Sequence, residues 1–185
     1  MPLKANSLTE KQLIKGCKDR IAKYQKGVFD RYAGKMLAVC RRYARHEMEA
    51  EDMMQDGFVK VFRYIDTFGD KGSFEGWVRR IMINTSLKHC SKSAFKKESI
   101  GIETMPETSV NPEVFAKIGT EELMNLIQNL PTGYRIVFNL YAIEGFSHKE
   151  IADSLGIGES TSRSQLVKAR RILQKKVEEL AKIAV

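Results

Sequence analysis

The chain has 185 residues, of which 43% are hydrophobic and 29% charged, and its formal net charge is +8 with a pI near 9.4. These values indicate a soluble globular protein of one ordinary domain or two small ones, and they exclude a membrane-spanning chain because no window approaches ~18 apolar residues. The excess of positive charge favours a polyanionic partner, since phosphate backbones bind clustered Lys and Arg largely through counterion release.

Nearly every periodic stretch repeats close to every 3.6 residues and none alternates at period two, which predicts an all-α fold of two small helical domains joined by a flexible linker. A capping box, formed either by Ser7 with Glu10 or by Thr9 with Gln12, predicts the start of a first helix. A second helix is expected over residues 26–45, where apolar residues recur at steps of three and four. Its predicted core residues are Phe29, Tyr32, Met36, Cys40 and Tyr43.

A third helix is expected over residues 49–68, and the glycine-bounded segment 69–72 separates it from a fourth helix over residues 74–92. These four helices predict a first domain that covers residues 1–92. On the third helix the apolar face comprises Met54, Phe58, Val61, Phe62 and Ile65, and on the fourth the inward residues are Trp77, Ile81 and Leu87.

Residues 93–118 are predicted to be the linker, because apolar residues are sparse up to Pro112 and such a segment buries too little surface to offset its ordering entropy. Two further helices are expected on either side of Pro131, which suits the first turn of the second. Gly145 ends that pair. The second domain then covers residues 119–185.

A helix-turn-helix pattern occupies residues 147–173, "SHKEIADSLGIGESTSRSQLVKARRIL". Ser147 is a suitable N-cap, Gly156 suits a turn that needs a positive φ, and Leu166 is a suitable apolar anchor. The inward residues of its first helix are Ile151, Ala152 and Leu155. The alternative is an unrelated pair of helices joined by a glycine turn.

The leading end of the second helix of this motif carries short hydroxyl side chains, and its basic residues lie further back. In a helix-turn-helix the leading turn enters the major groove, so short side chains let the backbone approach the base edges while Arg163 can reach a guanine. The rearward basic residues can meet backbone phosphates, although a solvated helical face is the alternative. The hydroxyl residues are Ser160, Thr161, Ser162 and Ser164, and the basic residues are Lys168, Arg170, Arg171, Lys175 and Lys176.

The third helix has a second, outward face that suits the docking of a basic partner helix. Its residues are Asp52, Gln55, Asp56, Val59 and Arg63. A divalent metal or an acid catalyst is an alternative for the carboxylates, but helical geometry spreads them and no His is suitably placed, so no metal ligand is assigned. The third interpretation of these residues is an ordinary solvated acidic face.

Basic residues alternate with aromatic rings in the segment 68–97, a combination that suits single-stranded or opened nucleic acid. Trp77 is interpreted as a core residue rather than a stacking platform. The basic residues are Lys71, Arg79, Arg80, Lys88, Lys92, Lys96 and Lys97.

The chain offers no phosphate-binding loop, no nucleophile with a base and no cofactor motif, so we expect neither catalytic residues nor a cofactor nor a small-molecule substrate. Cys17, Cys40 and Cys90 lie far apart without zinc spacing, which indicates reduced thiols and, with no signal-peptide pattern, a cytoplasmic protein.

These stretches closely resemble the sigma-70 family of RNA polymerase sigma factors, in the small extracytoplasmic-function group. Residues 29–89, from "FDRYAGK" to "NTSLKH", resemble region two of that family, and residues 126–173, from "LIQNLPTGY" to "ARRIL", resemble region four. The resemblance implies promoter-specific transcription initiation, with strand opening, on core RNA polymerase. It also implies promoter DNA and an anti-sigma factor as partners.

The resemblance further implies a role for particular residues. Residues that dock on the clamp helices of the largest polymerase subunit would be Asp52, Gln55, Asp56 and Val59. Residues at the minus-ten element, where a non-template base is flipped, would be Lys71, Ser73, Arg79, Arg80, Asn84 and Lys88. Residues at the minus-thirty-five element would be Ser160, Thr161, Arg163, Ser164, Lys168 and Arg171. Residues 129–141 would contact the flap of the second-largest subunit, and the linker would run toward the RNA exit channel.

Two departures from the family pattern limit what is carried over. The segment "KHCSK" has Cys90 and Ser91 where an arginine is common, so no phosphate contact is assigned there. Ser162 and Gln165 replace the more usual valine and arginine of the recognition helix, which leaves the base sequence open.

Two other functions fit the basic second domain. A helix-turn-helix repressor or activator would bind duplex DNA tightly without polymerase. A nucleic-acid hydrolase using the carboxylates between Glu49 and Asp56 would cleave in a metal-dependent way. Neither accounts for the outward face of the third helix together with the basic and aromatic segment that follows it.

Overall fold

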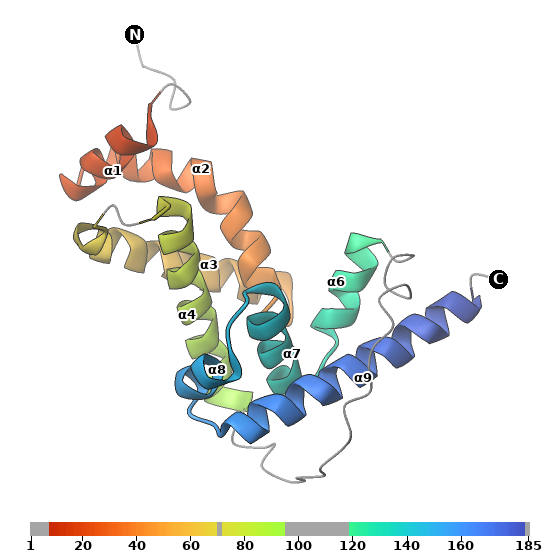
Figure 1. The fold of residues 1–185 in the computed structure, drawn as a ribbon. Coiled ribbons are helices and arrows are strands. Elements are labelled where there is room, and N and C mark those ends of the chain that lie inside the picture. Colours follow the sequence, from red (N-terminus) through yellow and green to blue (C-terminus); the bar gives the residue numbers. More distant parts are fainter. Residues whose placement is uncertain (1–7, 70–71, 95–118, 184–185) are drawn as a thin grey trace. The chain divides into compact units, whose positions relative to one another are not determined.

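In the computed structural model the described residues, 8–69, 72–94 and 119–183, contain helices and no strand, which confirms the predicted all-α class (Figure 1). The chain divides into two compact units, residues 1–86 and 87–185, and the boundary falls inside one long helix. The predicted linker falls largely on residues 95–118, which lie outside the described residues, so the domain limits stay a prediction.

The first unit begins with α1, Glu10–Lys18, and the capping box at its start is the one formed by Thr9 and Gln12. The Gln12 backbone N–H donates to Thr9 Oγ1, and the Thr9 N–H donates to Gln12 Oε1 at 2.9 Å. Ser7, the other predicted cap, lies outside the described residues. One of the two alternatives for the first helix is therefore confirmed.

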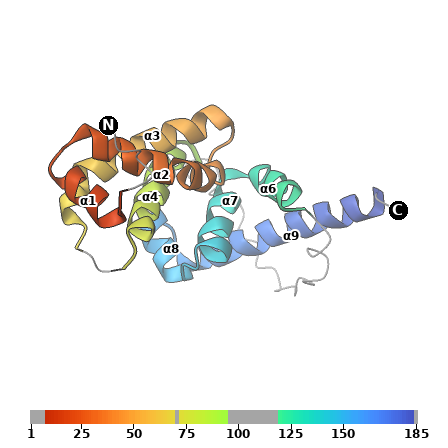
Figure 2. The ribbon, with the colours of Figure 1, turned by 90° about the horizontal axis from the view of Figure 1, so that it is seen from above.

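Helix α2 spans Ala22–Arg41, whereas the predicted range was 26–45, so both ends of the helix lie four residues earlier than predicted. The early start was missed because its first turn is mostly polar and carries no apolar period. At the other end, Tyr43 is fully buried although it lies beyond the helix, where a tight turn follows Cys40. Helix α2 lies beside both α1 and α3 (Figure 2).

Helix α3 spans Glu47–Tyr64 and continues as a 3-10 turn, Ile65–Thr67. It begins two residues before the predicted position because His46 caps it, with Nδ1 accepting from the backbone N–H of Glu49 at 3.2 Å. Helix α4 spans Phe74–Ala94, close to the prediction. The four-helix order of the first unit is confirmed.

The core of the first unit follows the predicted stripes on α2 and α3 but differs on α4. Trp77 and Ile81 are only half-buried, whereas Phe74, Val78 and Met82 are almost completely buried. The assignment of Trp77 to the core is therefore wrong. Its ring lies at the margin of an aromatic cluster with Phe68 and Phe74, at centroid distances of 5.6 and 5.7 Å.

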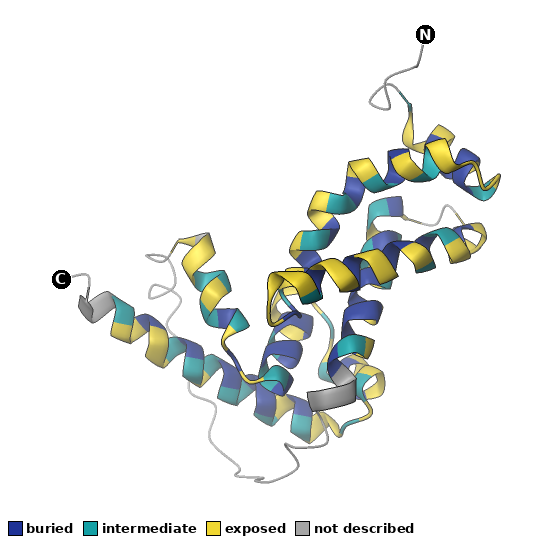
Figure 3. Ribbon diagram, turned by 180° about the vertical axis from the view of Figure 1, so that it is seen from behind, coloured by how far each residue is buried: buried dark blue, intermediate teal, exposed yellow. Residues whose placement is uncertain are grey.

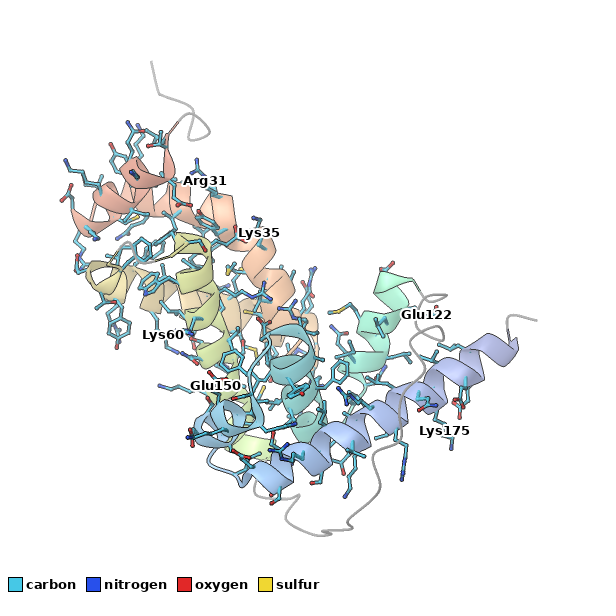
Figure 4. The ribbon with its side chains drawn as sticks, viewed as in Figure 1. Arg31, Lys35, Lys60, Glu122, Glu150 and Lys175 are labelled. Carbon is cyan, nitrogen blue, oxygen red and sulfur yellow. The ribbon has the colours of Figure 1, made fainter. Side chains whose placement is uncertain are left out.

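Polar contacts fix the ends of the helices in the first unit. Lys35 Nζ lies 2.6 Å from Glu75 Oε2 and so links α2 to the first turn of α4 (Figure 4). Lys18 Nζ donates to the carbonyl of Phe68 at 3.1 Å, and Arg20 pairs with Asp66, which together hold α1 against the end of α3. These contacts position the chain just before segment 69–72.

The second unit contains α6, Thr120–Gln128, then α7, Thr132–Phe138, which continues as a π-helical turn, Asn139–Ile143. Pro131 is the N-cap of α7 rather than a first-turn residue, and Gly145, with φ of +76°, ends the segment. Helix α8 spans His148–Leu155 and α9 spans Glu159–Ile183. The core that joins α6 to α9 comprises Ile127, Leu130, Ala169 and Leu173.

The predicted helix-turn-helix is formed by α8 and α9. Ser147 and Glu150 make a capping box at the start of α8. Gly156 ends α8 in the left-handed conformation, with φ of +67°, and Leu166 is buried. Ile151 and Ala152 are buried and Leu155 is half-buried, so the predicted turn and inward face are confirmed.

Replacing Gly156 by alanine is expected to lower the free energy of unfolding of the second unit by about 1 kcal/mol, because a Cβ disfavours positive φ. Gly34→Ala is the matched control: Gly34 is exposed inside α2, without positive φ, and a Cβ there would contact nothing within 4 Å. It should stabilise the chain by about 0.5–1 kcal/mol. Thermal melting followed by circular dichroism measures both, and equal shifts would contradict the assigned turn.

All three cysteines are buried and none forms a disulfide. Burial raises the pKa of the Cys17 and Cys40 thiols to about 11, so both stay protonated at neutral pH and pack as small apolar side chains. Within the described part of the chain, none of the helices is long and apolar enough to cross a membrane.

Candidate protein and nucleic-acid interfaces

The outward face of α3 is formed as predicted, and all four predicted polymerase-binding residues on it are exposed. We call Asp52, Gln55, Asp56 and Val59 the docking face. Val59 is 56% exposed, which is unusual for a valine on a helix whose opposite side is fully packed. Figure 3 shows this face of α3 as a continuous exposed strip. An exposed apolar residue with acidic and amide neighbours suits contact with another protein.

Sequence reasoning missed one member of this surface. Met48 is 65% exposed and lies one turn before Asp52, in line with Val59 further along the helix. The signal was present as a spacing of four residues, but Met48 sits in the acidic run "HEMEAED" and was not read as part of a face. With Met48 the docking face has an apolar residue toward each end.

The carboxylates before the docking face are engaged within the fold. Glu47 forms a two-atom contact with the Arg41 guanidinium, which lowers the pKa of the Glu47 carboxyl. Glu49 accepts from the backbone N–H of Arg45 at 2.6 Å. Among the described residues no group of three or more His, Cys, Asp or Glu side chains is arranged to hold a metal ion.

The predicted minus-ten residues fall mainly on one line along α4. Arg80, Asn84 and Lys88 are exposed at successive steps of four residues, and half-exposed Trp77 precedes them on the same side. Ser73 is exposed at the start of the helix, where its Oγ accepts from the Gly76 N–H at 3.0 Å. Arg79 is half-buried and lies off this line, and Lys71 lies outside the described residues.

The position of Trp77 gives this line an aromatic member, in place of the core position predicted for it. Its ring stacks on Phe74 with an interplanar angle of 22°. A ring supported from behind and partly open to solvent, beside basic and amide side chains, is a suitable platform for an unstacked base.

None of the six predicted minus-thirty-five residues belongs to the buried side of α9. Ser160, Arg163 and Arg171 are exposed, whereas Thr161, Ser164 and Lys168 are half-buried. Arg163 Nη2 lies 3.0 Å from Glu159 Oε2, and Ser164 Oγ donates to the Thr161 carbonyl. The packed side comprises Ser162, Gln165, Leu166, Ala169, Leu173 and Val177.

The two residues that depart from the family pattern in the recognition helix are both buried. Ser162 is 0% exposed and Gln165 is 7% exposed, so Ser162 is the one buried member of the four hydroxyl residues at the leading end of α9. Ser162 Oγ lies 2.9 Å from His148 Nδ1 across the turn. His148 was not singled out from the sequence, because a spacing of 14 residues between helices carries no local signal.

Two stretches of the chain match known families. Residues 28–95 match the family described as "Sigma-70 region 2", and residues 120–173 match the family described as "Sigma-70, region 4". Together the two matches cover more than half of the chain, in the order and with the separation that the sequence resemblance implied.

Curated relatives agree with these matches. The chain is 29% identical over 149 residues to the "ECF RNA polymerase sigma factor SigE" of Mycolicibacterium smegmatis, which covers 77% of this chain and 57% of that protein. It is 25% identical to the "ECF RNA polymerase sigma-E factor" of Haemophilus influenzae, with 95% of this chain and 99% of that protein covered. The chain thus spans little more than half of the first relative and nearly all of the second.

Among solved structures, the sigma factor RpoE of Bartonella quintana in complex with the anti-sigma factor NepR is similar to this chain. It has a TM-score of 0.49 and 20% identity, and the match covers 81% of this chain and 94% of that one.

Proposed function

This chain belongs to the sigma-70 family, in the extracytoplasmic-function group of RNA polymerase sigma factors, and on that premise we propose how its residues direct promoter-specific initiation. The protein is a sigma factor: it binds core RNA polymerase and lends it promoter recognition. The observation that carries the proposal is the coexistence of an exposed apolar and acidic docking face on α3 with separate basic faces on α4 and α9.

The docking face is proposed to bind the clamp helices of the largest polymerase subunit. Exposed Val59 supplies apolar area, and Asp52 and Gln55 supply polar partners on the same side of α3. A basic helix is the complementary partner for such a surface, since opposite potentials favour encounter and fix the register of binding.

The line on α4 is proposed to bind the minus-ten element as the strands open. Arg80 and Lys88 are exposed and basic, and Asn84 between them can hydrogen-bond a base edge. Trp77 lies where an unpaired base would stack. Opened DNA rather than duplex suits this face, because a duplex hides the base faces that a ring contacts.

The outer side of α9 is proposed to read the minus-thirty-five element in the major groove. The residues proposed to face base edges lie at its leading end and are Ser160, Thr161, Arg163 and Ser164, whereas Lys168 and Arg171 would meet phosphates. Residues 129–141 are proposed to contact the flap of the second-largest polymerase subunit. The path of the linker stays a prediction, since residues 95–118 lie outside the described residues.

Sigma factors are in general not enzymes, and we extend this to the present chain: it performs no covalent chemistry and supplies only binding energy to the polymerase. A cytoplasmic location is proposed because core polymerase and promoter DNA are found there. An anti-sigma factor is proposed as a further partner through membership of the same group.

The proposal is tested by adding the purified chain to core polymerase and a library of genomic templates, with run-off transcription as the readout. Promoter-specific transcripts that appear only with both components are expected. Tight duplex binding without polymerase, and no effect on the start sites, would instead identify an autonomous helix-turn-helix regulator. Core enzyme alone and the chain alone are the controls.

A further inference from the structure

Three segments of the second unit meet at one histidine. His148 is the first residue of α8, and its Nδ1 lies 2.9 Å from the hydroxyl oxygen of Ser162 in the first turn of α9. Its ring stacks on Tyr141 of the π-helical turn, with centroids 4.5 Å apart and an interplanar angle of 22°. The Arg170 guanidinium lies 5.8 Å from the centroid of the same tyrosine ring. The histidine therefore connects the π-helical turn, α8 and α9.

The contact between His148 and Ser162 is directional. Ser162 is 0% exposed, and a buried hydroxyl is costly unless it is hydrogen-bonded. An aliphatic side chain at this position, the more usual valine of the family, would pack without a preferred direction. A hydrogen bond at 2.9 Å, by contrast, fixes the rotation of α9 about its own axis at the leading turn.

That rotation matters because Ser162 lies between two residues proposed to face DNA. Thr161 and Arg163 flank it directly, and Ser164 is within the same turn. Contacts to base edges require side chains to be held to within about 0.5 Å of the productive geometry. Contacts to phosphate tolerate larger displacements because they carry no sequence information.

We infer that His148 is a positioning residue for upstream promoter recognition: through its bond to Ser162 and its stack on Tyr141 it fixes the leading turn of α9 so that the base-facing side chains keep their register. The inference rests on the proposed function of α9, but assigns a role to a residue that does not itself touch a base. Its consequence is that the preference for the cognate element depends on His148, whereas the sequence-independent affinity for DNA does not.

Two substitutions at His148 separate its two contacts. His148→Phe keeps a ring that can stack on Tyr141 but has no nitrogen for Ser162, and His148→Asn keeps a hydrogen-bonding amide near the place of Nδ1 but loses the stack. Ser162→Ala removes the other partner. Asp153→Ala, at an exposed position on the same helix, is the control.

The experiment measures binding of holoenzyme, assembled from each variant and core polymerase, to a cognate promoter and to versions with single base changes in the upstream element. His148→Phe and Ser162→Ala are each expected to lower the discrimination ratio about tenfold, ~1.4 kcal/mol. Their double variant should lose no more than either single change, because both remove one bond. His148→Asn should retain more discrimination than His148→Phe, and the control should match the unmodified chain.

Three outcomes would overturn the inference. An even loss of affinity for all promoter versions would mean that the imidazole contacts phosphate directly. A lower melting temperature with unchanged discrimination would leave His148 with a merely structural role, and additive losses in the double variant would mean that the two residues act separately. Failure of the unmodified holoenzyme to discriminate at all would count against the proposed function instead, so the two failures are distinguishable.

Discussion

Replacing Asp52 and Gln55 together by alanine is expected to abolish binding to core polymerase at concentrations where the unmodified chain binds fully. Both side chains are exposed on the docking face on either side of the line through Val59. Residues near the centre of an interface that lose their partners cost about 2 kcal/mol or more each, so a loss of affinity on the order of 1,000-fold follows for the pair. Fluorescence anisotropy of labelled protein titrated with core enzyme measures the change.

The same double substitution should leave the first unit folded. Both side chains project from α3 into solvent, and substitutions at such positions usually change stability by less than about 0.5 kcal/mol. Gln25→Ala with Asp30→Ala is the matched control, since it removes the same residue types from α2. If the α3 variant bound core enzyme as tightly as the control does, the docking face would not be the surface that binds polymerase.

The fold was largely predictable because its signals are local. The capping boxes at Thr9 and Ser147 each join residues three apart, and the positive φ at Gly156 is favoured by the residue type alone. The boundaries of α2 were not predictable in the same way. Its first turn carries no apolar period. At the other end the apolar spacing continues to Tyr43, which is buried as predicted but lies beyond the end of the helix, so the pattern placed that end too late.

The candidate interfaces were predictable as faces but not in their detail. Helical spacing alone placed Asp52, Gln55 and Val59 on one side of α3, and the structure exposes them. Helical spacing did not show that the Trp77 ring stays partly exposed. A tryptophan at the margin of an aromatic cluster and one in its centre occur at the same positions in the helical repeat. The burial of Ser162 was also missed, since it depends on the partner that α8 brings to it.

Replacing Arg163 by alanine is expected to relax discrimination at one base pair of the upstream element by about 1–3 kcal/mol, or roughly 5- to 150-fold. Arg163 is exposed at the leading end of α9, where a guanidinium can donate two parallel hydrogen bonds to a guanine. Its ion pair with Glu159 is exposed, and such pairs contribute at most about 1 kcal/mol to stability. A hydrogen bond from Arg163 to a base can therefore replace the ion pair at little cost. Holoenzyme binding to promoters with every substitution in that element measures the effect.

Glu159→Ala separates the ion pair of Arg163 from its proposed contact with a base. The change removes the residue that competes for Arg163 in the free chain but leaves the guanidinium, so affinity for the cognate promoter should rise slightly with the base preference retained. Arg163→Lys keeps the charge without the planar fork, and it should recover phosphate attraction but not discrimination. If Arg163→Ala weakened binding evenly across all sequences and Arg163→Lys restored it, Arg163 would contact only phosphate, and base reading on α9 would fall to Ser160, Thr161 and Ser164.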